Sequence, residues 1–356
     1  MRYFVSAGEP SGDMHLAFLV KHIKLLNKEA KFFGAAGSRS KNEGVEIIQD
    51  IEEMAVMGFK EIAGRYSFFK KKLYEYIEFI KKNSIKNVIM VDYGGFNLAF
   101  LKILKREIKD IKVFYYIPPK LWVWGEWRIR KLKLADEILA IFPWEVEFYK
   151  KKNIEAVYFG NPLADLRKEV ESFGESILLL PGSRRQEILS LFPVMNKCAE
   201  IMKEKKFILK LADRGDLRFI SELADNIEVD FDSTLEEICS KCKIAIAASG
   251  TVTLELALMG LPSIVVYKTS KINEFIARRI INVKYVSLPN LVKNSEVYKE
   301  LLQKNMSAEN IIKEIVNIEA DYENKKKELK DIRERLGGIK IISKYAAYIA
   351  ERSSND

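Results

Sequence analysis

"SAGEPSGDMH", residues 6–15, places a glycine-bearing turn between a short apolar segment and a helical pattern. Tyr3, Phe4 and Val5 precede the turn, and apolar residues at helical spacing follow it. A turn that ends a strand and opens a helix is where doubly wound sheets bind ligands, and its free amide groups favour anions. The turn matches neither the dinucleotide-binding nor the Walker glycine motif, and it carries acids of its own. These features predict a ligand other than a bare phosphate.

The same alternation of apolar strands and amphipathic helices continues along the chain and predicts β-α-β units with a parallel sheet. At 356 residues, the chain exceeds the size at which one hydrophobic core usually stops growing. We therefore predict an α/β protein of two Rossmann-like, doubly wound domains that face each other across a cleft. The predicted strands are 2–6, 31–35, 87–92, 112–117, 137–142 and 156–162 in the first half, and 176–182, 207–212, 227–231, 243–248 and 262–267 in the second.

The predicted domains are residues 1–165 and 175–320, joined by a polar seam that contains Gly174. A third segment, 321–356, continues a charge-dense helix, is interrupted by Gly337-Gly338, and ends in an amphipathic helix. Whether this last helix packs back on the first domain or is swapped into a partner chain in a homodimer is left open by the sequence.

Composition is that of an ordinary globular protein, with 48% hydrophobic and 31% charged residues. The net charge of +9 comes with lysine spread along the whole chain, so no nucleic-acid partner is predicted. We find no signal-peptide pattern and no stretch near the ~20 apolar residues of a membrane span. The three cysteines are interpreted as buried thiols in a reducing cytosol, with no zinc site.

Two turns in the second half are typical of anion binding. In "AASGTVTLE" (247–255), Ser249-Gly250-Thr251 follow a strand, either hydroxyl is expected to cap the next helix, and Glu255 suits the hydroxyls of a ribose. In "LLLPGSRRQEI" (178–188), Ser183 and Arg184 open another helix, and arginine suits phosphate. A well-capped helix with a solvated glutamate is the structural alternative for the first turn. Together the two turns predict a nucleotide diphosphate site.

In the first half, "VIMVDYGGFN" (88–97) places Asp92 at a strand end, where a carboxylate suits the base that takes a proton from a hydroxyl. A turn-capping aspartate is the alternative.

Three tryptophans in 117–132 indicate a lid, a ligand wall or a core cluster. Residues 54–76 mix apolar residues with lysines, which suits either a membrane-surface segment or an ordinary helix. In "DFD" (230–232) a helix N-cap by Asp232 or Ser233 is favoured over a metal site.

Several of these stretches, taken in order, resemble one family, the lipid-A-disaccharide synthases, which are inverting, metal-independent glycosyltransferases of the GT-B fold. The combination of GEPSGD, AVMGF and SLPNL is specific, whereas the SGT turn alone is not. The matching stretches are "AGEPSGD" (7–13), "EEMAVMGFKEI" (52–62), "VDYGGFN" (91–97), "GNPLAD" (160–165), "LLPGSR" (179–184), "ASGTVTLE" (248–255) and "YVSLPNL" (285–291).

The resemblance implies a reaction and roles. UDP-2,3-diacylglucosamine is the donor, and the 6-hydroxyl of 2,3-diacylglucosamine 1-phosphate (lipid X) attacks it to give a β-1,6 disaccharide 1-phosphate and UDP, with no cofactor and no metal. The implied roles are catalytic for Asp92, Asn290 and Glu9, nucleotide-binding for Ser183, Arg184, Ser249, Gly250, Thr251 and Glu255, and acceptor-binding for Ser11, Gly12, Asp13 and Asn97.

Because both substrates carry acyl chains, the resemblance also implies peripheral attachment to the anionic, cytoplasmic face of the inner membrane. The expected membrane contacts are Val56, Met57, Phe59, Phe68 and Phe69. One departure is Gly125, where the family commonly has arginine, so that Arg128 or Arg130 is left as a substitute. Another UDP-sugar transferase, an epimerase, or a non-catalytic UDP-binding protein at a membrane are the competing interpretations.

Overall fold

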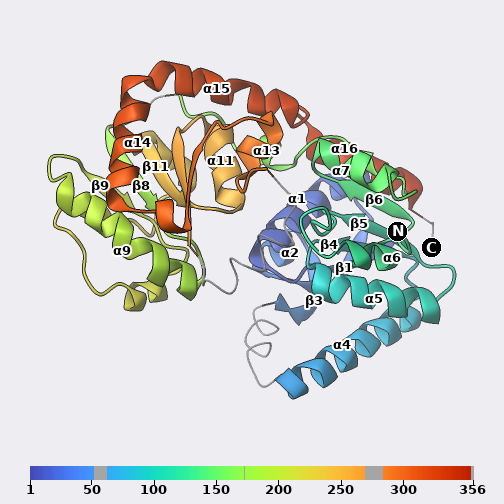
Figure 1. Ribbon diagram of the computed structural model, residues 1–356. Helices are drawn as coiled ribbons and strands as arrows, with labels where there is room; N and C mark the ends of the chain where they lie inside the picture. Colours follow the sequence, from blue (N-terminus) through green and yellow to red (C-terminus); the bar gives the residue numbers. More distant parts are fainter. Residues whose placement is uncertain (52–61, 172, 269–283, 354–356) are drawn as a thin grey trace. The chain divides into compact units, whose positions relative to one another are not determined.

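The computed structural model describes residues 1–51, 62–171, 173–268 and 284–353, and the chain forms two compact units (Figure 1). Unit 1 consists of Met1–Pro162 with Ile339–Asp356, and unit 2 consists of Leu163–Gly338. Each unit is built on one parallel sheet. The predicted class, α/β with two Rossmann-like domains, is confirmed.

Unit 1 contains a seven-stranded parallel sheet with the strand order β3-β2-β1-β4-β5-β6-β7. Its central strands are buried along nearly their whole length because helices cover both faces, as parallel sheets require. The strands are β1 (Arg2–Ser6), β2 (Lys31–Ala36), β3 (Val45–Asp50), β4 (Asn87–Val91), β5 (Lys112–Tyr116), β6 (Glu137–Ala140) and β7 (Val157–Tyr158).

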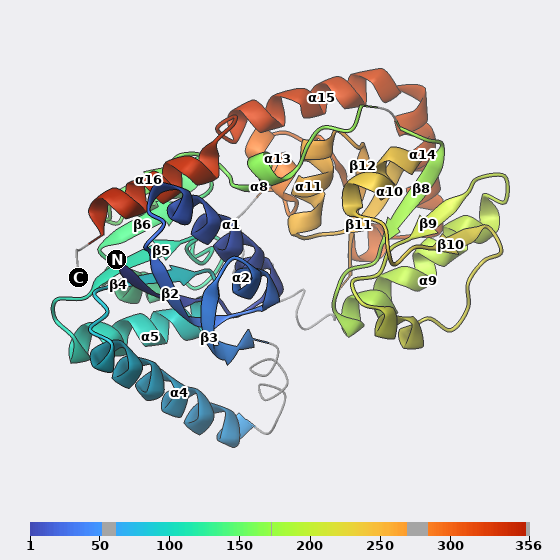
Figure 2. The same ribbon diagram turned by 180° about the vertical axis from the view of Figure 1, so that it is seen from behind.

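The helices of unit 1 divide between the two faces of this sheet (Figures 1 and 2). Helices α4 (Ile62–Lys82) and α5 (Gly94–Glu107) pack together on one face, where Phe4 contacts Tyr76 and Phe100. Helices α1 (Pro10–Leu26) and α16 (Ile341–Arg352) pack on each other and cover the other face. The shorter helices are α2 (Ser38–Asn42), η1 (Glu126–Arg128), α6 (Ile129–Leu132) and α7 (Pro143–Lys150).

The end of the chain completes unit 1. Helix α16 buries five side chains, among them Ile341, Ile349 and Tyr345. The Tyr345 hydroxyl hydrogen-bonds the Gly160 carbonyl at 2.9 Å and accepts from the Phe159 amide at 3.2 Å. The expected third segment, 321–356, is therefore divided, since α16 packs on α1 of the same chain while the preceding helix belongs to unit 2.

Unit 2 repeats the design with a six-stranded parallel sheet in the order β10-β9-β8-β11-β12-β13. The strands are β8 (Ser176–Leu180), β9 (Phe207–Leu209), β10 (Ile227–Val229), β11 (Cys242–Ala248), β12 (Ser263–Tyr267) and β13 (Lys299–Leu302). The helices are α8 (Leu163–Leu166), α9 (Arg185–Ile201), η2 (Arg214–Phe219), α10 (Leu235–Lys241), α11 (Thr251–Met259), α13 (Leu288–Lys293), η3 (Gln303–Asn305), α14 (Ala308–Ala320) and α15 (Tyr322–Arg335).

Two strands, β3 and β13, are absent from the strands predicted by the sequence. Both are edge strands of their sheets, and each is only partly buried. Because a half-exposed edge strand needs no continuous apolar run, its sequence carries little of the signal by which the central strands are recognised.

The closure of unit 1 by α16 gives a test. We expect Tyr345→Phe to lower the free energy of unfolding by about 1–3 kcal/mol, because the Phe159 amide and the Gly160 carbonyl lose a buried partner. Urea unfolding measures the loss, and hydrogen exchange locates it in unit 1. Tyr348→Phe is the control, since that hydroxyl bonds Glu137 in a half-exposed place. Equal losses in the two variants would contradict the assignment.

Candidate functional site

The turns with the sequence-predicted site residues lie at the point where each sheet reverses its strand order. In unit 1, β1 and β4 are neighbours, and the turns that follow them contain Glu9 and Asp92. In unit 2, β8 and β11 are neighbours, and the turns that follow them contain Arg184 and Gly250. Consecutive helices leave such a point toward opposite faces of the sheet, so a crevice opens there.

The two turns of unit 1 are in direct contact. A side chain at Gly8 would put its Cβ 2.1 Å from the Tyr93 ring, so only glycine allows this approach. Asp92 and Tyr93 both have left-handed backbone conformations, with φ of 45° and 47°. Non-glycine residues rarely adopt this conformation, and such strain concentrates at functional sites. The turn that carries Asp92 is thus held in a costly conformation.

A buried amide maintains this conformation. Asn97 donates from Nδ2 to the Asp92 carbonyl at 3.0 Å and to the Val91 carbonyl at 3.2 Å, while its Oδ1 accepts from Ser6 Oγ at 2.7 Å. The Tyr115 hydroxyl donates to the Asp92 carbonyl at 2.9 Å. Asn97 is fully buried. Asn97 thus positions the Asp92 turn, and its expected contact with the acceptor stays a prediction.

Asp92 lines a pocket of about 290 Å³ within unit 1. Burial raises the pKa of the Asp92 carboxyl; the Lys120 ammonium lowers it, and the Glu9 carboxylate raises it further. A carboxylate whose pKa is raised toward neutrality is a better proton acceptor than an exposed aspartate. The pocket is lined by Asp92, Gly94, Gly95, Ile117, Pro118, Pro119, Lys120, Arg128, Ile141, Phe142 and Glu145.

The residues of the opening turn have different roles. Asp13 is buried, and its carboxylate accepts from the amides of Gly37, Arg39 and Ser40 at 2.8, 3.1 and 3.3 Å. It therefore caps α2 from within the protein, and its contact with the acceptor stays a prediction. Gly12 is buried against Ala7 and Val91. Glu9 and Ser11 are exposed and stay available to a ligand.

In unit 2, the helix after β11 has an open N-terminus. The N-cap of α11 is Gly250, and no side chain caps the helix, so the expected cap by Ser249 or Thr251 is wrong. A Cβ at Gly250 would meet no atom within 4 Å, and both Gly250 and Thr251 are exposed. The start of α11 is consequently uncovered at Gly250 and Thr251, as an anion site at a helix N-terminus requires.

The helix after β8 is different, because its N-terminus is already capped. The Glu187 carboxylate accepts from the amides of Ser183 and Arg184 at 3.2 and 3.3 Å. Gly182, at φ 103°, makes room for that carboxylate. The Arg184 side chain is 80% exposed and lies 3.2 Å from Glu187. At this turn the exposed Arg184 guanidinium, rather than the capped helix start, is therefore the cationic group open to a ligand.

Glu255 is held by an arginine that the sequence did not single out. Arg167 donates from Nε and Nη2 to one Glu255 oxygen at 2.9 and 2.7 Å, and from Nη1 to Glu236 at 2.9 Å. All three side chains are partly buried. The other Glu255 oxygen has no hydrogen bond to the described residues, so the carboxylate is fixed in place with an oxygen left for a ligand.

Asn290 is hydrogen-bonded within unit 2. It is fully buried, donates to the Tyr298 carbonyl and to Glu300 at 2.8 and 2.9 Å, and accepts from the amides of Val297 and Tyr298 at 2.9 and 2.8 Å. These bonds use all its donors and its acceptor. The catalytic role that the resemblance implies for Asn290 stays a prediction. The structure gives Asn290 the role of joining α13 to β13.

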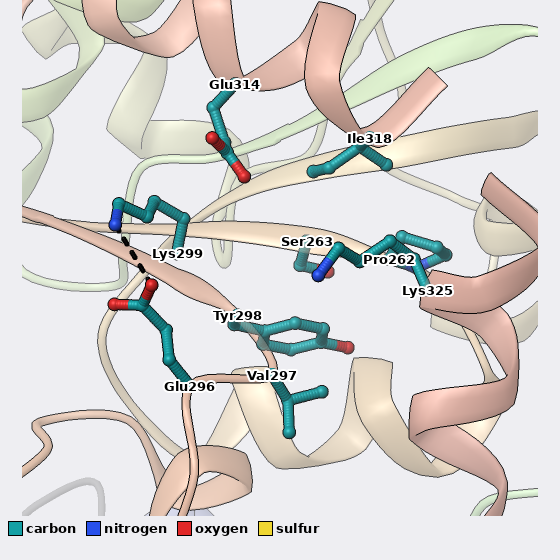
Figure 3. A pocket seen from close by; sticks show the side chains of 9 residues that line it. All are labelled: Pro262, Ser263, Glu296, Val297, Tyr298, Lys299, Glu314, Ile318 and Lys325. Atoms are coloured by element: carbon teal, nitrogen blue, oxygen red, sulfur yellow. Dashed lines mark hydrogen bonds and ion pairs between the residues drawn. The ribbon is translucent and has the colours of Figure 1, made fainter. Parts of the chain in front are cut away.

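A small hollow in unit 2 lies beside the contact between α13 and β13, at the amino ends of β12 and β13 (Figure 3). Its volume is about 30 Å³, and an ion pair between Glu296 and Lys299 spans 3.0 Å on one side of it. This volume holds little more than a water molecule. Since ligands of doubly wound folds bind at the carboxyl ends of the strands, we assign no function to this hollow.

Comparison with known proteins now identifies the family. A model of the family described as lipid-A-disaccharide synthetase matches residues 3–352. The chain is 34% identical over 359 residues to lipid-A-disaccharide synthase of Geobacter sulfurreducens, covering 94% of this chain and 93% of that protein. It is 32% identical over 360 residues to the synthase of Trichlorobacter lovleyi, covering 95% and 94%.

The chain belongs to the lipid-A-disaccharide synthetase family. A solved structure described as the S. aureus MnaA-UDP co-structure superposes with a TM-score of 0.68 over 98% of this chain and 95% of that one, at 12% identity. At this identity the likeness shows the fold alone. Family and fold together support a glycosyltransferase that uses a UDP-sugar, as the sequence resemblance implied.

In this family member, acids and thiols outside the two sites have structural roles. Asp230 accepts from Ser233 and Asp232 pairs with Arg214, while Thr234 is the N-cap of α10, so the expected cap by Asp232 or Ser233 is wrong. Cys198, Cys239 and Cys242 are buried and unpaired. Among the described residues, no group of three or more His, Cys, Asp or Glu side chains has a geometry that could hold a metal ion.

The expected membrane contacts are only partly described. Val56, Met57 and Phe59 lie outside the described residues. Phe68 and Phe69 are half-buried. The Phe69 ring packs on the Phe96 ring with 5.7 Å between the ring centroids, so Phe69 lies at the edge of the hydrophobic core of unit 1. In the described part of the chain, no helix is both long and apolar enough to span a membrane.

The tryptophan loop contains both a core part and an exposed part. Trp122 packs edge-to-face on Trp144 at 5.4 Å. The Trp124 and Trp127 rings pack edge-to-face with 5.1 Å between their centroids, but the two residues are 46% and 65% exposed. Of the three interpretations of these tryptophans, a core cluster thus holds for Trp122 alone.

Glu145 is a pocket residue that sequence reasoning missed. It is fully buried and accepts from Trp122 Nε1 and from the amides of Ile141 and Phe142, each at 3.0 Å. Burial raises the pKa of Glu145 to about 7, although these hydrogen bonds and Lys120 lower it. "FPWE" (142–145) does carry a signal of a helix start, with proline at the first position and an acid at the third, but nothing in it signals burial.

The raised pKa of Glu145 predicts a pH-dependent stability. Between about pH 4.5 and 7 the unfolded chain releases the Glu145 proton while the folded chain keeps it, so stability falls with rising pH across this window. We expect the midpoint of thermal unfolding of wild type to decrease relative to Glu145→Gln from pH 4.5 to 7 and then to run parallel to it. Exposed Glu147→Gln is the control. Parallel curves throughout the range would rule out the raised pKa.

Proposed function

We propose that this protein transfers 2,3-diacylglucosamine from UDP-2,3-diacylglucosamine to the 6-hydroxyl of 2,3-diacylglucosamine 1-phosphate. The products are a β-1,6-linked disaccharide 1-phosphate and UDP, with inversion at the anomeric carbon. The observation that carries this proposal is the family match along residues 3–352. The strained Asp92 turn and the open start of α11 support it, since they supply a base and an anion site.

Asp92 is the proposed base. As the acceptor 6-oxygen forms its bond to the anomeric carbon, the carboxylate takes the hydroxyl proton, and the bond between that carbon and the UDP oxygen breaks. The electron pair of the broken bond leaves with UDP. Exposed Glu9 and Ser11 lie on the neighbouring turn and offer hydrogen bonds to the sugar of the acceptor.

The nucleotide is proposed to bind unit 2. The amides at the start of α11 and the Arg184 guanidinium balance the charge that develops on the departing diphosphate, a task that needs no bound metal. The oriented Glu255 carboxylate accepts from the ribose hydroxyls, while Ser183, Ser249 and Thr251 supply further polar contacts. Arg167 positions Glu255 without touching the nucleotide.

An apolar groove supports a lipid substrate. It measures about 500 Å³, lies between α4 and α5, and is lined by Phe69, Lys70, Leu73, Tyr93, Gly95, Phe96, Ala99 and Ile103. Gly95 lines both this groove and the Asp92 pocket, so the two are adjacent. We propose that an acyl chain of the acceptor occupies the groove while its sugar occupies the pocket.

We further propose peripheral attachment to the cytoplasmic face of the inner membrane. Exposed Trp124 and Trp127 have the amphipathic rings that favour a membrane interface, and basic Arg130, Lys131 and Lys133 follow them in sequence. Phe68 and Lys70–Lys72 on α4 provide a second apolar and basic segment. Val56, Met57 and Phe59 precede this segment in the sequence.

The proposed base is tested by Asp92→Asn. Loss of general-base assistance is typically worth about 10²–10⁴ in rate, so we expect turnover to fall by that factor while UDP affinity stays unchanged. Mass spectrometry of the disaccharide phosphate measures turnover, and calorimetry measures UDP binding. EDTA is expected to leave wild-type turnover unaffected. Turnover of the variant within about threefold of wild type would remove Asp92 from this role.

The proposed nucleotide site is tested by comparing substitutions of Glu255 and Glu236, the two carboxylates that pair with Arg167. We expect Glu255→Gln to weaken UDP binding by about 10–100-fold, because a hydrogen bond to a charged group is worth about 1.5–3 kcal/mol. Glu236→Gln is the matched control, since it removes the other partner of Arg167. Calorimetric titration with UDP checks both variants. Equal losses would mean that Glu255 acts only through the fold of unit 2.

A further inference from the structure

The Asp92 pocket contains an arginine to which no role has been given. Arg128 lies in the loop after β5, and its guanidinium stacks over the Trp124 ring at 4.9 Å from the ring centroid. Nη2 donates to the Trp124 carbonyl at 3.2 Å. Arg128 lines the pocket together with Asp92, Lys120 and Glu145.

The Arg128 guanidinium has donor capacity that the described protein groups do not use. Its Nε is buried and has no hydrogen-bond partner among the described residues. Arg128 also makes no ion pair within the described part of the chain, although two carboxylates line the same pocket. An arginine has five N–H donors, and leaving a buried donor unpaired is costly unless something else binds it.

Because Gly125 has no side chain, it leaves room for the Arg128 guanidinium. This residue has φ 82°, and a Cβ on it would lie 2.6 Å from Arg128 Nε and 2.8 Å from Nη2. Any side chain at position 125 therefore displaces Arg128. Gly94 adds to the same arrangement, because a Cβ there would lie 2.5 Å from Pro119 and 3.9 Å from Arg128 Nη1. The guanidinium thus lies against the first residue of α5, on the pocket side of Asp92.

The charges around the pocket favour an anion rather than a neutral group. Lys120 is exposed and lines the pocket as a second cation. Of the two carboxylates, Glu145 already accepts from three donors that belong to the protein. Asp92 is the other carboxylate that lines the pocket; a backbone hydrogen bond from Tyr93 lowers its pKa, and the Glu9 carboxylate is near enough to raise it. Arg128 keeps an N–H donor that no described group accepts, and this donor remains for an added anion. A phosphate monoester carries about −1.5 to −2 charges at neutral pH and offers three acceptor oxygens, which matches a planar guanidinium beside an ammonium.

We propose that Arg128, assisted by Lys120, binds the phosphate monoester of the acceptor and so selects phosphorylated over unphosphorylated acceptors. This inference rests on the proposed function, because it takes the acceptor sugar to lie in the Asp92 pocket. Arg128 is then a specificity-determining residue.

The experiment compares two acceptors that differ only in the phosphate: 2,3-diacylglucosamine with and without its 1-phosphate. For wild type we expect kcat/KM to favour the phosphorylated acceptor by about 10–100-fold, as expected for hydrogen bonds between charged groups. For Arg128→Gln we expect the two values to lie within about threefold of each other, with the change mainly in KM of the phosphorylated acceptor. Exposed Arg106→Gln, which removes a surface ion pair with Glu107 on α5, is the matched control and keeps the preference.

Two further variants separate binding from folding. Arg128→Lys keeps one charge and is expected to recover part of the preference, whereas a merely structural role gives no such recovery. Gly125→Ala displaces the guanidinium without removing it and is expected to lower the preference as well.

The inference is overturned if Arg128→Gln keeps the preference, or if it slows both acceptors by the same factor. Transfer by wild type to neither acceptor is a different result, because it removes the proposed function itself and the inference with it.

Discussion

The reversal of strand order in each sheet is the constraint on which the two sites depend. Between β1 and β4, and again between β8 and β11, neighbouring parallel strands continue into helices on opposite faces. The turns at their carboxyl ends therefore diverge and leave their backbone amides and short side chains uncovered. The proposed base Asp92, the proposed anion site at the start of α11 and the guanidinium groups all belong to these turns or to the loops beside them. Everything else in each unit keeps these turns in place.

Much of the family's sequence pattern serves that supporting purpose. Asp13, Asn97 and Asn290 look like ligand-binding residues in sequence, yet each is buried and hydrogen-bonded within the protein. Their partners are mainly backbone groups, with the Ser6 and Glu300 side chains added for Asn97 and Asn290. A strained turn such as Asp92-Tyr93 persists only where its surroundings over-determine it. The buried amide and carboxylate groups supply that determination, and the exposed residues between them, Glu9, Ser11 and Thr251, are left for ligands.

The sequence predicts the central strands and the turns that carry the sites because both depend on local patterns. A buried parallel strand needs an unbroken apolar run, and a turn into a helix needs glycine and small polar residues. Arg167 and Glu145 could not be found in this way. Arg167 lies in a polar stretch that has the composition of a linker, and its partner Glu255 is 88 residues away. Glu145 has the local pattern of an ordinary helix start, and its burial comes from Trp122 and the β6 end packing over it.

The return of α16 to unit 1 has a consequence for how the protein is made. A ribosome releases the residues that complete the first unit only after it has synthesised all of the second, which at ~5–20 residues per second takes roughly 10–35 s. During that time the apolar surface of α1 that α16 later buries is uncovered in the nascent chain. The first unit can therefore acquire its last helix only after the whole of the second unit has been synthesised.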